Sequence, residues 1–269
     1  MEFITTNVII IFFFLLLIHS VETLAYATRL AGARIGLIAS ALSLFNVMVT
    51  VSRMSNMLQQ PFTGGIIDHS GENALVVVSE QFRVLIFGST AGSIIGMILL
   101  PTFIAAFSRA ILHLSEENGS VLNFFRKGIS NKWFAHVRWY IKLPSAHYFK
   151  GFHFRLIPKR LFVLNMLITS IYTIGVLSAL YAGLLAPERS TTAVTASGLV
   201  NGVATILLAL FVDPKISVLA DGVSKGKINY KYLKWTSVTL VFSRVCGTIL
   251  AQALFIPAAY YIAWMTKWL

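Results

Sequence analysis

The stretch at residues 8–24 reads VIIIFFFLLLIHSVETL, and it decides the class of fold. A helix needs roughly 20 apolar residues to cross the hydrocarbon core of a bilayer, and this run continues past Leu24. A cleaved signal peptide would begin with basic residues. The chain begins instead with Met-Glu-Phe-Ile, which is acidic, so we expect a retained first membrane helix.

The whole chain has the composition of a membrane protein. Of its 269 residues, 57% are hydrophobic and 12% are charged, whereas soluble domains have about a quarter charged residues. The single cysteine, Cys246, cannot form an intramolecular disulfide. We expect an all-α integral membrane protein with about six transmembrane helices, at residues 7–26, 35–57, 84–107, 161–185, 192–212 and 235–265, of which the last is long enough to tilt or break.

The basic residues predict the orientation in the membrane. Most Lys and Arg residues lie in the first, third and fifth loops, and such loops face the cytoplasm in membrane proteins. We therefore expect a multi-pass protein of the bacterial cytoplasmic membrane with both termini outside. A net charge of +12 could also indicate a nucleic-acid partner. Because the bases lie beside spans, where they set topology and bind anionic lipid, no nucleic acid is expected.

The long third loop, residues 109–160, has a composition of its own. Between residues 120 and 160 it mixes basic residues such as Arg126 and Lys132 with aromatic ones such as Trp133 and Trp139. Such interleaving also occurs on surfaces that bind single-stranded nucleic acid. Its position between two spans favours an amphipathic segment in the head-group plane that contacts anionic membrane lipids.

The two halves of the chain match at one fixed offset. When the chain is shifted by 155 residues, Asn46 falls on Asn201, Thr50 on Thr205 and Gly92 on Gly247. Compositional bias is the alternative explanation, although it accounts poorly for the polar matches. The matches predict a first three-helix repeat at residues 1–108 and a second at 161–269. Because three is an odd number of spans, the second repeat would have inverted topology, as in many secondary transporters.

Prolines occur at similar places in the two predicted repeats. Pro61 and Pro214 are expected just after the second and fifth spans, and Pro101 and Pro257 late in the third and sixth. Proline removes a helix hydrogen bond and is tolerated in membranes where a cavity or a neighbouring group satisfies the backbone. These positions are therefore expected to lie near a substrate cavity between the repeats.

Charges inside apolar spans are costly and indicate candidate functional residues. Arg53 lies deep in the second span, and Ser52, Asn56 and Gln59 share one stripe of that helix. The candidates form a polar cleft between the first, second, fifth and sixth spans. Substrate-binding candidates are Arg53, Asn46, Ser55, Asn56, Gln59, Arg244, Arg29 and Arg34, although Arg29 and Arg34 fit better as topology determinants and head-group contacts.

The acidic candidates have two interpretations. His19 and Glu22 lie three positions apart in the first span, and Asp213 closes the fifth. These three residues form either a proton relay or ion pairs with arginines that hold the bundle together. The chain contains no phosphate-binding loop, HExxH, CxxC or GxSxG motif, so no metal or other cofactor and no catalytic residue are expected.

Several stretches resemble the Amj family, bacterial proteins also called YdaH. The resemblance rests on residues 19–26 (HSVETLAY), 29–34 (RLAGAR), 43–46 (SLFN), 52–57 (SRMSNM), 60–61 (QP), 195–202 (TASGLVNG) and 213–214 (DP). It extends over nearly the whole chain. The resemblance implies a lipid II flippase, which moves the undecaprenyl-diphosphate-linked peptidoglycan precursor from the inner to the outer leaflet, and implies a functional link with peptidoglycan synthesis.

The residue pattern is compatible with this activity. Arg53, together with Arg244, would neutralise the diphosphate while the polyprenyl tail stays in lipid, and alternating access between the repeats would move the head group. Two other classes stay open. One is an intramembrane enzyme acting on polyprenyl phosphates through Glu22, His19 and Asp213; the other is an ion-coupled small-molecule transporter. A membrane scaffold and a homo-oligomer are further alternatives.

Overall fold

A computed structural model describes residues 5–71, 73–116 and 158–268 of the chain. The described residues form long helices and no strand. In chain order they are α1 (Thr6–Ile35), α2 (Ile38–Asp68), α3 (Ala74–Glu116), α6 (Lys159–Leu185), a 3₁₀ turn (Pro187–Arg189), α7 (Ser190–Leu207), a π turn (Leu208–Val212), α8 (Asp213–Ser224) and α9 (Tyr230–Met265). The expected interfacial segment at residues 120–160 lies almost wholly outside the described residues.

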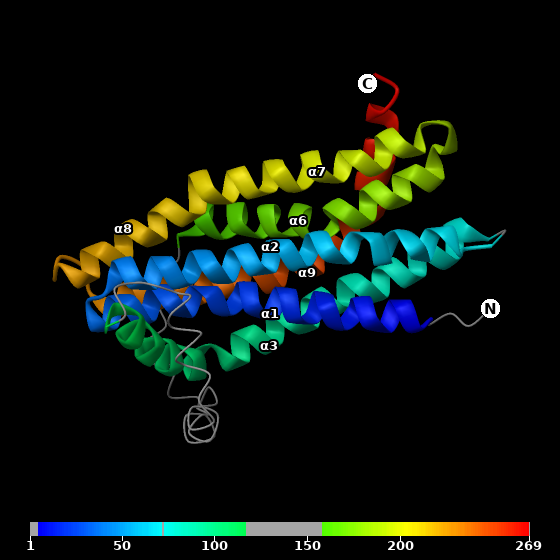
Figure 1. Ribbon diagram of the computed structural model, residues 1–269. Helices are drawn as coiled ribbons and strands as arrows, with labels where there is room; N and C mark the ends of the chain where they lie inside the picture. Colours follow the sequence, from blue (N-terminus) through cyan, green and yellow to red (C-terminus); the bar gives the residue numbers. More distant parts are fainter. Residues whose placement is uncertain (1–4, 72, 117–157, 269) are drawn as a thin grey trace.

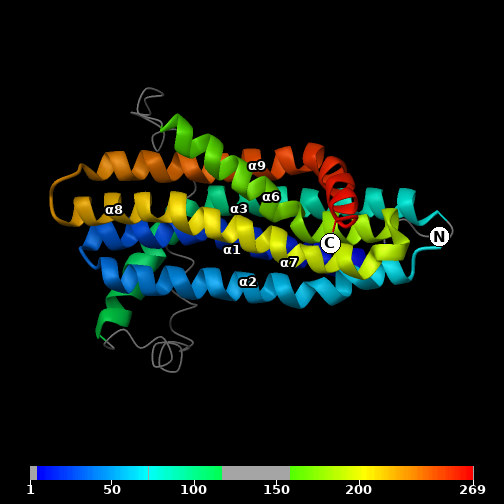
Figure 2. The same cartoon turned by 90° about the horizontal axis from the view of Figure 1, so that it is seen from above.

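Six helical segments are long and apolar enough to cross a membrane, as the sequence predicts. The fifth is composite, since α7, the π turn and α8 together form the span Pro187–Ser224. Figures 1 and 2 show the long helices running beside one another as a bundle, with the C-terminal part of α9 turned away from the rest. Pro257 lies in that part of α9, and a proline inside a helix is a common cause of a bend.

The predicted ends of the second and fifth spans were wrong. Pro61 lies inside α2, which continues to Asp68 rather than ending near residue 57. Pro214 is the second residue of α8, which carries the fifth span on to Ser224. A proline in the first turn of a helix costs no hydrogen bond, because the first amides of a helix have no partner within it. Pro214 therefore restarts the helix after the π turn instead of ending the span.

Helices α1 and α6, which are the first helices of the N-terminal and C-terminal halves, each pack between two other helices of the same half. Helix α1 packs against α2 and α3, and α6 packs in the same way against α7 and α9. Most of the C-terminal part of α1 and of α6 is buried. Helices α2 and α7 are much less buried and expose apolar side chains such as Met57 and Leu58 on α2 and Leu199 and Val203 on α7. Exposed apolar faces of this kind suit contact with lipid.

Two glycines at matching positions permit close packing in each half. A Cβ atom on Gly92 of α3 would collide with the backbone of Leu16 in α1. A Cβ atom on Gly247 of α9 would collide with the carbonyl oxygen of Met166 in α6. Small residues commonly let membrane helices approach closely in this way. The two halves share this packing order, whereas the repeat and its inverted topology stay predictions.

Candidate functional site

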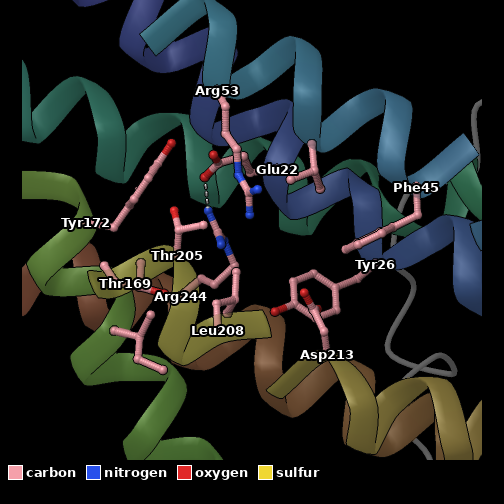
Figure 3. A pocket seen from close by; sticks show the side chains of 13 residues that line it. Glu22, Tyr26, Phe45, Arg53, Thr169, Tyr172, Thr205, Leu208, Asp213 and Arg244 are labelled. Atoms are coloured by element: carbon pink, nitrogen blue, oxygen red, sulfur yellow. Dashed lines mark hydrogen bonds and ion pairs between the residues drawn. The ribbon is translucent and has the colours of Figure 1, made fainter. Parts of the chain in front are cut away.

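A small pocket, with a cavity volume of about 40 Å³, lies among five of the six spans. Figure 3 shows the side chains that line it. Glu22 and Tyr26 come from α1, Arg53 comes from α2, and Arg244 comes from α9. The composite fifth span adds Thr205, Leu208 and Asp213. The cleft was expected between the first, second, fifth and sixth spans, but the fourth span, α6, also lines it with Ile168, Thr169 and Tyr172.

Glu22 and Arg244 form a buried ion pair at this pocket. Arg244 Nη2 donates a hydrogen bond to Glu22 Oε2, and the two side chains are 9% and 6% exposed. Ser52 Oγ donates to the other carboxylate oxygen, Glu22 Oε1, at 2.9 Å. The three residues therefore join α1, α2 and α9. Of the two interpretations of Glu22, the ion pair is present in the structure.

A second ion pair joins Arg29 of α1 to Asp213 at the start of α8. Arg29 Nη2 lies 2.9 Å from Asp213 Oδ1, and its side chain is 3% exposed. Its guanidinium also lies over the ring of Phe45, 3.8 Å from the centroid, in a cation–π arrangement. The expectation that Arg29 contacts lipid head groups was wrong. Helix α1 continues inside the bundle to Ile35, so Arg29 faces protein rather than the membrane surface.

Arg53 differs from the other two arginines at this site. It lies near the middle of α2, is partly buried, and extends into the pocket toward the Glu22–Arg244 pair (Figure 3). Within the described part of the chain, no carboxylate forms an ion pair with it. Glu22 and Asp213 are already matched by Arg244 and Arg29. Among the described residues, the pocket lining together with Arg29 therefore carries one positive charge more than Glu22 and Asp213 balance.

The other polar residues of α2 do not line the pocket. Asn56 and Gln59 are buried as their shared stripe predicts, and Gln59 Nε2 donates to Asn56 Oδ1 at 2.9 Å. Ser55 Oγ donates to the carbonyl oxygen of Val51 in its own helix. Asn46 is exposed. Direct contact between these residues and a substrate in this pocket stays a prediction.

The two remaining candidates also lie away from the pocket. His19 is buried at 1% exposure, one turn before Glu22 on α1, and does not line the pocket. Arg34 is exposed in the last turn of α1, as expected of a topology determinant. Neither residue is therefore placed where it would contact a substrate in this pocket.

The sequence reasoning missed several pocket residues that carry hydroxyl groups. Tyr26 donates its phenol hydrogen to Asn165 Oδ1 at 3.4 Å, and Asn165 Nδ2 donates to Ser243 Oγ at 2.7 Å. Thr169 and Tyr172 extend from α6 on another wall of the pocket (Figure 3). A search for polar side chains in apolar spans could have found Tyr26 and Asn165. No such search would have shown that they share a site with Arg53.

Comparison with known proteins gives two matches over almost the full length. The family model Amj, described as "Alternate to MurJ", matches residues 14–266. A curated protein from Bacillus subtilis (strain 168), named Lipid II flippase Amj, is 74% identical over 268 residues, and the alignment covers 100% of each chain. No solved structure matches the chain.

Proposed function

Because the chain belongs to the Amj family, we propose that it is a lipid II flippase whose substrate head group crosses the membrane through the pocket around Arg53. In this proposal the precursor moves from the inner to the outer leaflet of the bacterial cytoplasmic membrane. The polyprenyl tail stays in lipid, and the diphosphate occupies the pocket. Both termini lie outside the cell.

The unbalanced charge of Arg53 is the observation that carries this proposal. A charged side chain at membrane depth is costly unless another group satisfies it. Glu22 and Asp213 are engaged by the other two arginines, so neither is free for Arg53. A guanidinium presents several donors in a planar fork that matches two phosphate oxygens. A diphosphate would therefore supply the missing negative charge.

The surroundings of the pocket suit a lipid with a large polar head. Arg53 of α2 and Thr205 of α7 both line it, and these two helices expose apolar faces outside the pocket. A head group in the pocket could therefore keep its tail in the membrane beside α2 and α7. With a cavity volume of about 40 Å³ the pocket in this structure has room for only a few water molecules, so it has to open before the diphosphate can enter.

Both ion pairs connect the two predicted repeats. Glu22 and Arg29 belong to residues 1–108, whereas Arg244 and Asp213 belong to residues 161–269. In an alternating-access cycle the two halves move relative to each other around a central site. The two pairs are then the polar contacts that break and form again as the pocket opens toward each leaflet.

The alternative of an enzyme acting on polyprenyl phosphates is less well supported. Its expected acids, Glu22 and Asp213, are both held in ion pairs and are not free to act as a base. His19 does not line the pocket. Analysis of the recovered lipid distinguishes the two functions, because an enzyme would change it chemically and a flippase would return it unchanged.

Liposomes that contain the purified chain and fluorescent lipid II test the proposed function. A reagent that quenches only the outer leaflet reports how fast lipid II changes sides. We expect flipping with the wild-type chain, flipping slowed roughly 10- to 100-fold with Arg53→Gln, and unchanged flipping with Arg189→Gln, a matched change at an exposed arginine outside the pocket. Equal flipping by the two variants would remove Arg53 from the mechanism, and no flipping by the wild type would refute the function.

A further inference from the structure

A second and larger groove lies at one end of the bundle. It lies between the start of α6, helix α8 and the start of α9 and has a cavity volume of about 630 Å³. These three parts lie at the same end of the molecule (Figure 1). It shares no lining residue with the first pocket. Asp213 lines the first pocket and the next residue, Pro214, lines the groove, so the start of α8 separates the two.

The charged residues of the groove are all basic. Lys159 and Arg160 lie at the start of α6, and Lys215 faces them from α8. Each of the three is exposed at the surface. No acidic residue occurs among the described residues that line the groove. Clusters of Lys and Arg at a membrane surface attract anionic lipid head groups.

Thr236 on the floor of the groove supplies an independent observation. Its side chain is 2% exposed, and its hydroxyl oxygen has no hydrogen-bond partner among the described residues. Many hydroxyls in the spans donate to a backbone carbonyl, as Thr63 does to Gln59, whereas Thr236 is one of several buried hydroxyls without a partner and is the one of them that lines this groove. A buried polar group without a partner costs free energy. An oxygen of a bound phosphate could accept the hydrogen bond that Thr236 otherwise lacks.

The walls between these polar groups are apolar. Val218 and Leu219 of α8 line the groove beside Lys215, and Val218 is 67% exposed. A groove with cations at its rim, a hydroxyl donor at its floor and an aliphatic wall matches an amphiphile with a phosphate head. From this arrangement we infer that the groove is a second site, which binds the phosphate head group of a membrane lipid.

Two lipids could supply this chemistry. One is the diphosphate of the transported precursor, held here before it enters the first pocket. The other is a resident anionic phospholipid such as phosphatidylglycerol. The inference goes beyond the proposed transport function and stands without it, because binding to the groove can be measured while no transport occurs.

Photo-crosslinking of the full-length purified chain tests the site. Phosphatidylglycerol that carries a diazirine on its acyl chain is irradiated with the chain in detergent, and mass spectrometry locates the labelled peptides. We expect labels on the peptides that contain the start of α6, α8 or the start of α9. An excess of unlabelled phosphatidylglycerol or undecaprenyl diphosphate should suppress the labels, whereas diacylglycerol, which has no phosphate, should not. The stronger of the two phosphate competitors identifies the source.

Substitutions within the groove give the matched comparison. Lys159→Gln combined with Lys215→Gln should raise the concentration for half-maximal labelling about 25-fold, since each base near the surface contributes about fivefold. Lys227→Gln combined with Lys231→Gln removes two exposed bases outside the groove. This double variant should change the concentration for half-maximal labelling little. Equal effects of the two double variants, or equal competition by diacylglycerol, would overturn the inference.

Thr236→Val separates a ligand contact from a structural role. The change replaces the unpaired hydroxyl by a methyl group of similar size, so the melting temperature of the lipid-free protein should stay the same or rise. Half-maximal labelling should nevertheless require a severalfold higher lipid concentration. A lower melting temperature with unchanged labelling would show that the hydroxyl serves the fold and not the ligand.

Discussion

Arg244 and Glu22 form a hydrogen-bonded ion pair inside the bundle, although 222 positions separate them in the chain. Both side chains are less than 10% exposed. This pair determines which arginine is left for substrate. Because Arg244 occupies Glu22 and Arg29 occupies Asp213, the guanidinium of Arg53 faces the pocket without an acidic partner among the described residues.

Neutralising only one partner of the Glu22–Arg244 pair should destabilise the protein strongly. Glu22→Gln leaves the positive charge of Arg244 buried without a counter-ion, which typically costs about 3–5 kcal/mol. The double variant Glu22→Gln with Arg244→Met removes the charge as well and should recover much of the loss. Thermal unfolding of the purified variants in detergent measures both. If the double variant were as unstable as the single one, the pair would not be the cause.

Breaking the Arg29–Asp213 pair should cost less. In Asp213→Asn the guanidinium keeps its contact with the ring of Phe45 and a long hydrogen bond of 3.5 Å to the backbone oxygen of residue 213. The Asp213 side chain is also 22% exposed, so water can replace part of the lost interaction. We expect a smaller fall in melting temperature than with Glu22→Gln. The reverse order would place the main polar contact between the halves at α8.

Replacing Arg53 by lysine should separate the effect of its positive charge on the flipping rate from the effect of its hydrogen-bond geometry. Lysine keeps the positive charge but cannot donate two parallel hydrogen bonds to a phosphate. A charge-assisted hydrogen bond contributes about 1.5–3 kcal/mol, so Arg53→Gln should slow flipping roughly 10- to 100-fold. Arg53→Lys should lie between this variant and the wild type. Initial flipping rates in liposomes over a range of lipid II concentrations measure the effect, and equal rates for lysine and glutamine would exclude a role for charge alone.

The close approach of α3 to α1 should tolerate no side chain at Gly92. Gly92→Ala places a methyl group against the backbone of Leu16 and should cost about 1–3 kcal/mol of stability by overpacking. Gly64→Ala in α2 is the control, because nothing lies within 4 Å of its Cβ position. That change should be neutral or stabilising by up to about 1 kcal/mol, since alanine favours helices. Thermal unfolding measures both, and a neutral Gly92→Ala would contradict the packing.

A membrane potential should bias the direction of flipping. An anionic head group that leaves a negative-inside compartment gains roughly 2.3 kcal/mol per charge for each 100 mV. Proteoliposomes with a potassium gradient and valinomycin set the potential without any nucleotide. We expect more lipid II in the outer leaflet at inside-negative potential than at zero potential. An unchanged distribution would mean that the charge of the head group is compensated during transport.

The six spans and the polar stripe of α2 could be predicted from the sequence. Helices that cross a bilayer must be long, apolar and internally hydrogen-bonded, and this requirement can be read residue by residue. The burial of Ser52, Asn56 and Gln59 follows from helical spacing in the same way. The extents of α2 and of the fifth span were underestimated, because a proline can lie inside a membrane helix when neighbouring groups satisfy the backbone.

Local sequence thus determined how many helices cross the membrane and which of their side chains are polar, because hydropathy and helical period depend only on nearby residues. The tertiary structure alone decided which arginines form ion pairs with acidic side chains. By sequence Arg53 and Arg244 lie inside predicted spans and Arg29 lies in the loop after the first span, and only the packing of α1 against α8 and α9 gives Arg29 and Arg244 an acidic partner. Ion pairing requires contact between groups that are distant in the chain, so the local pattern that made Arg53 a candidate could not show that it lacks an acidic partner among the described residues.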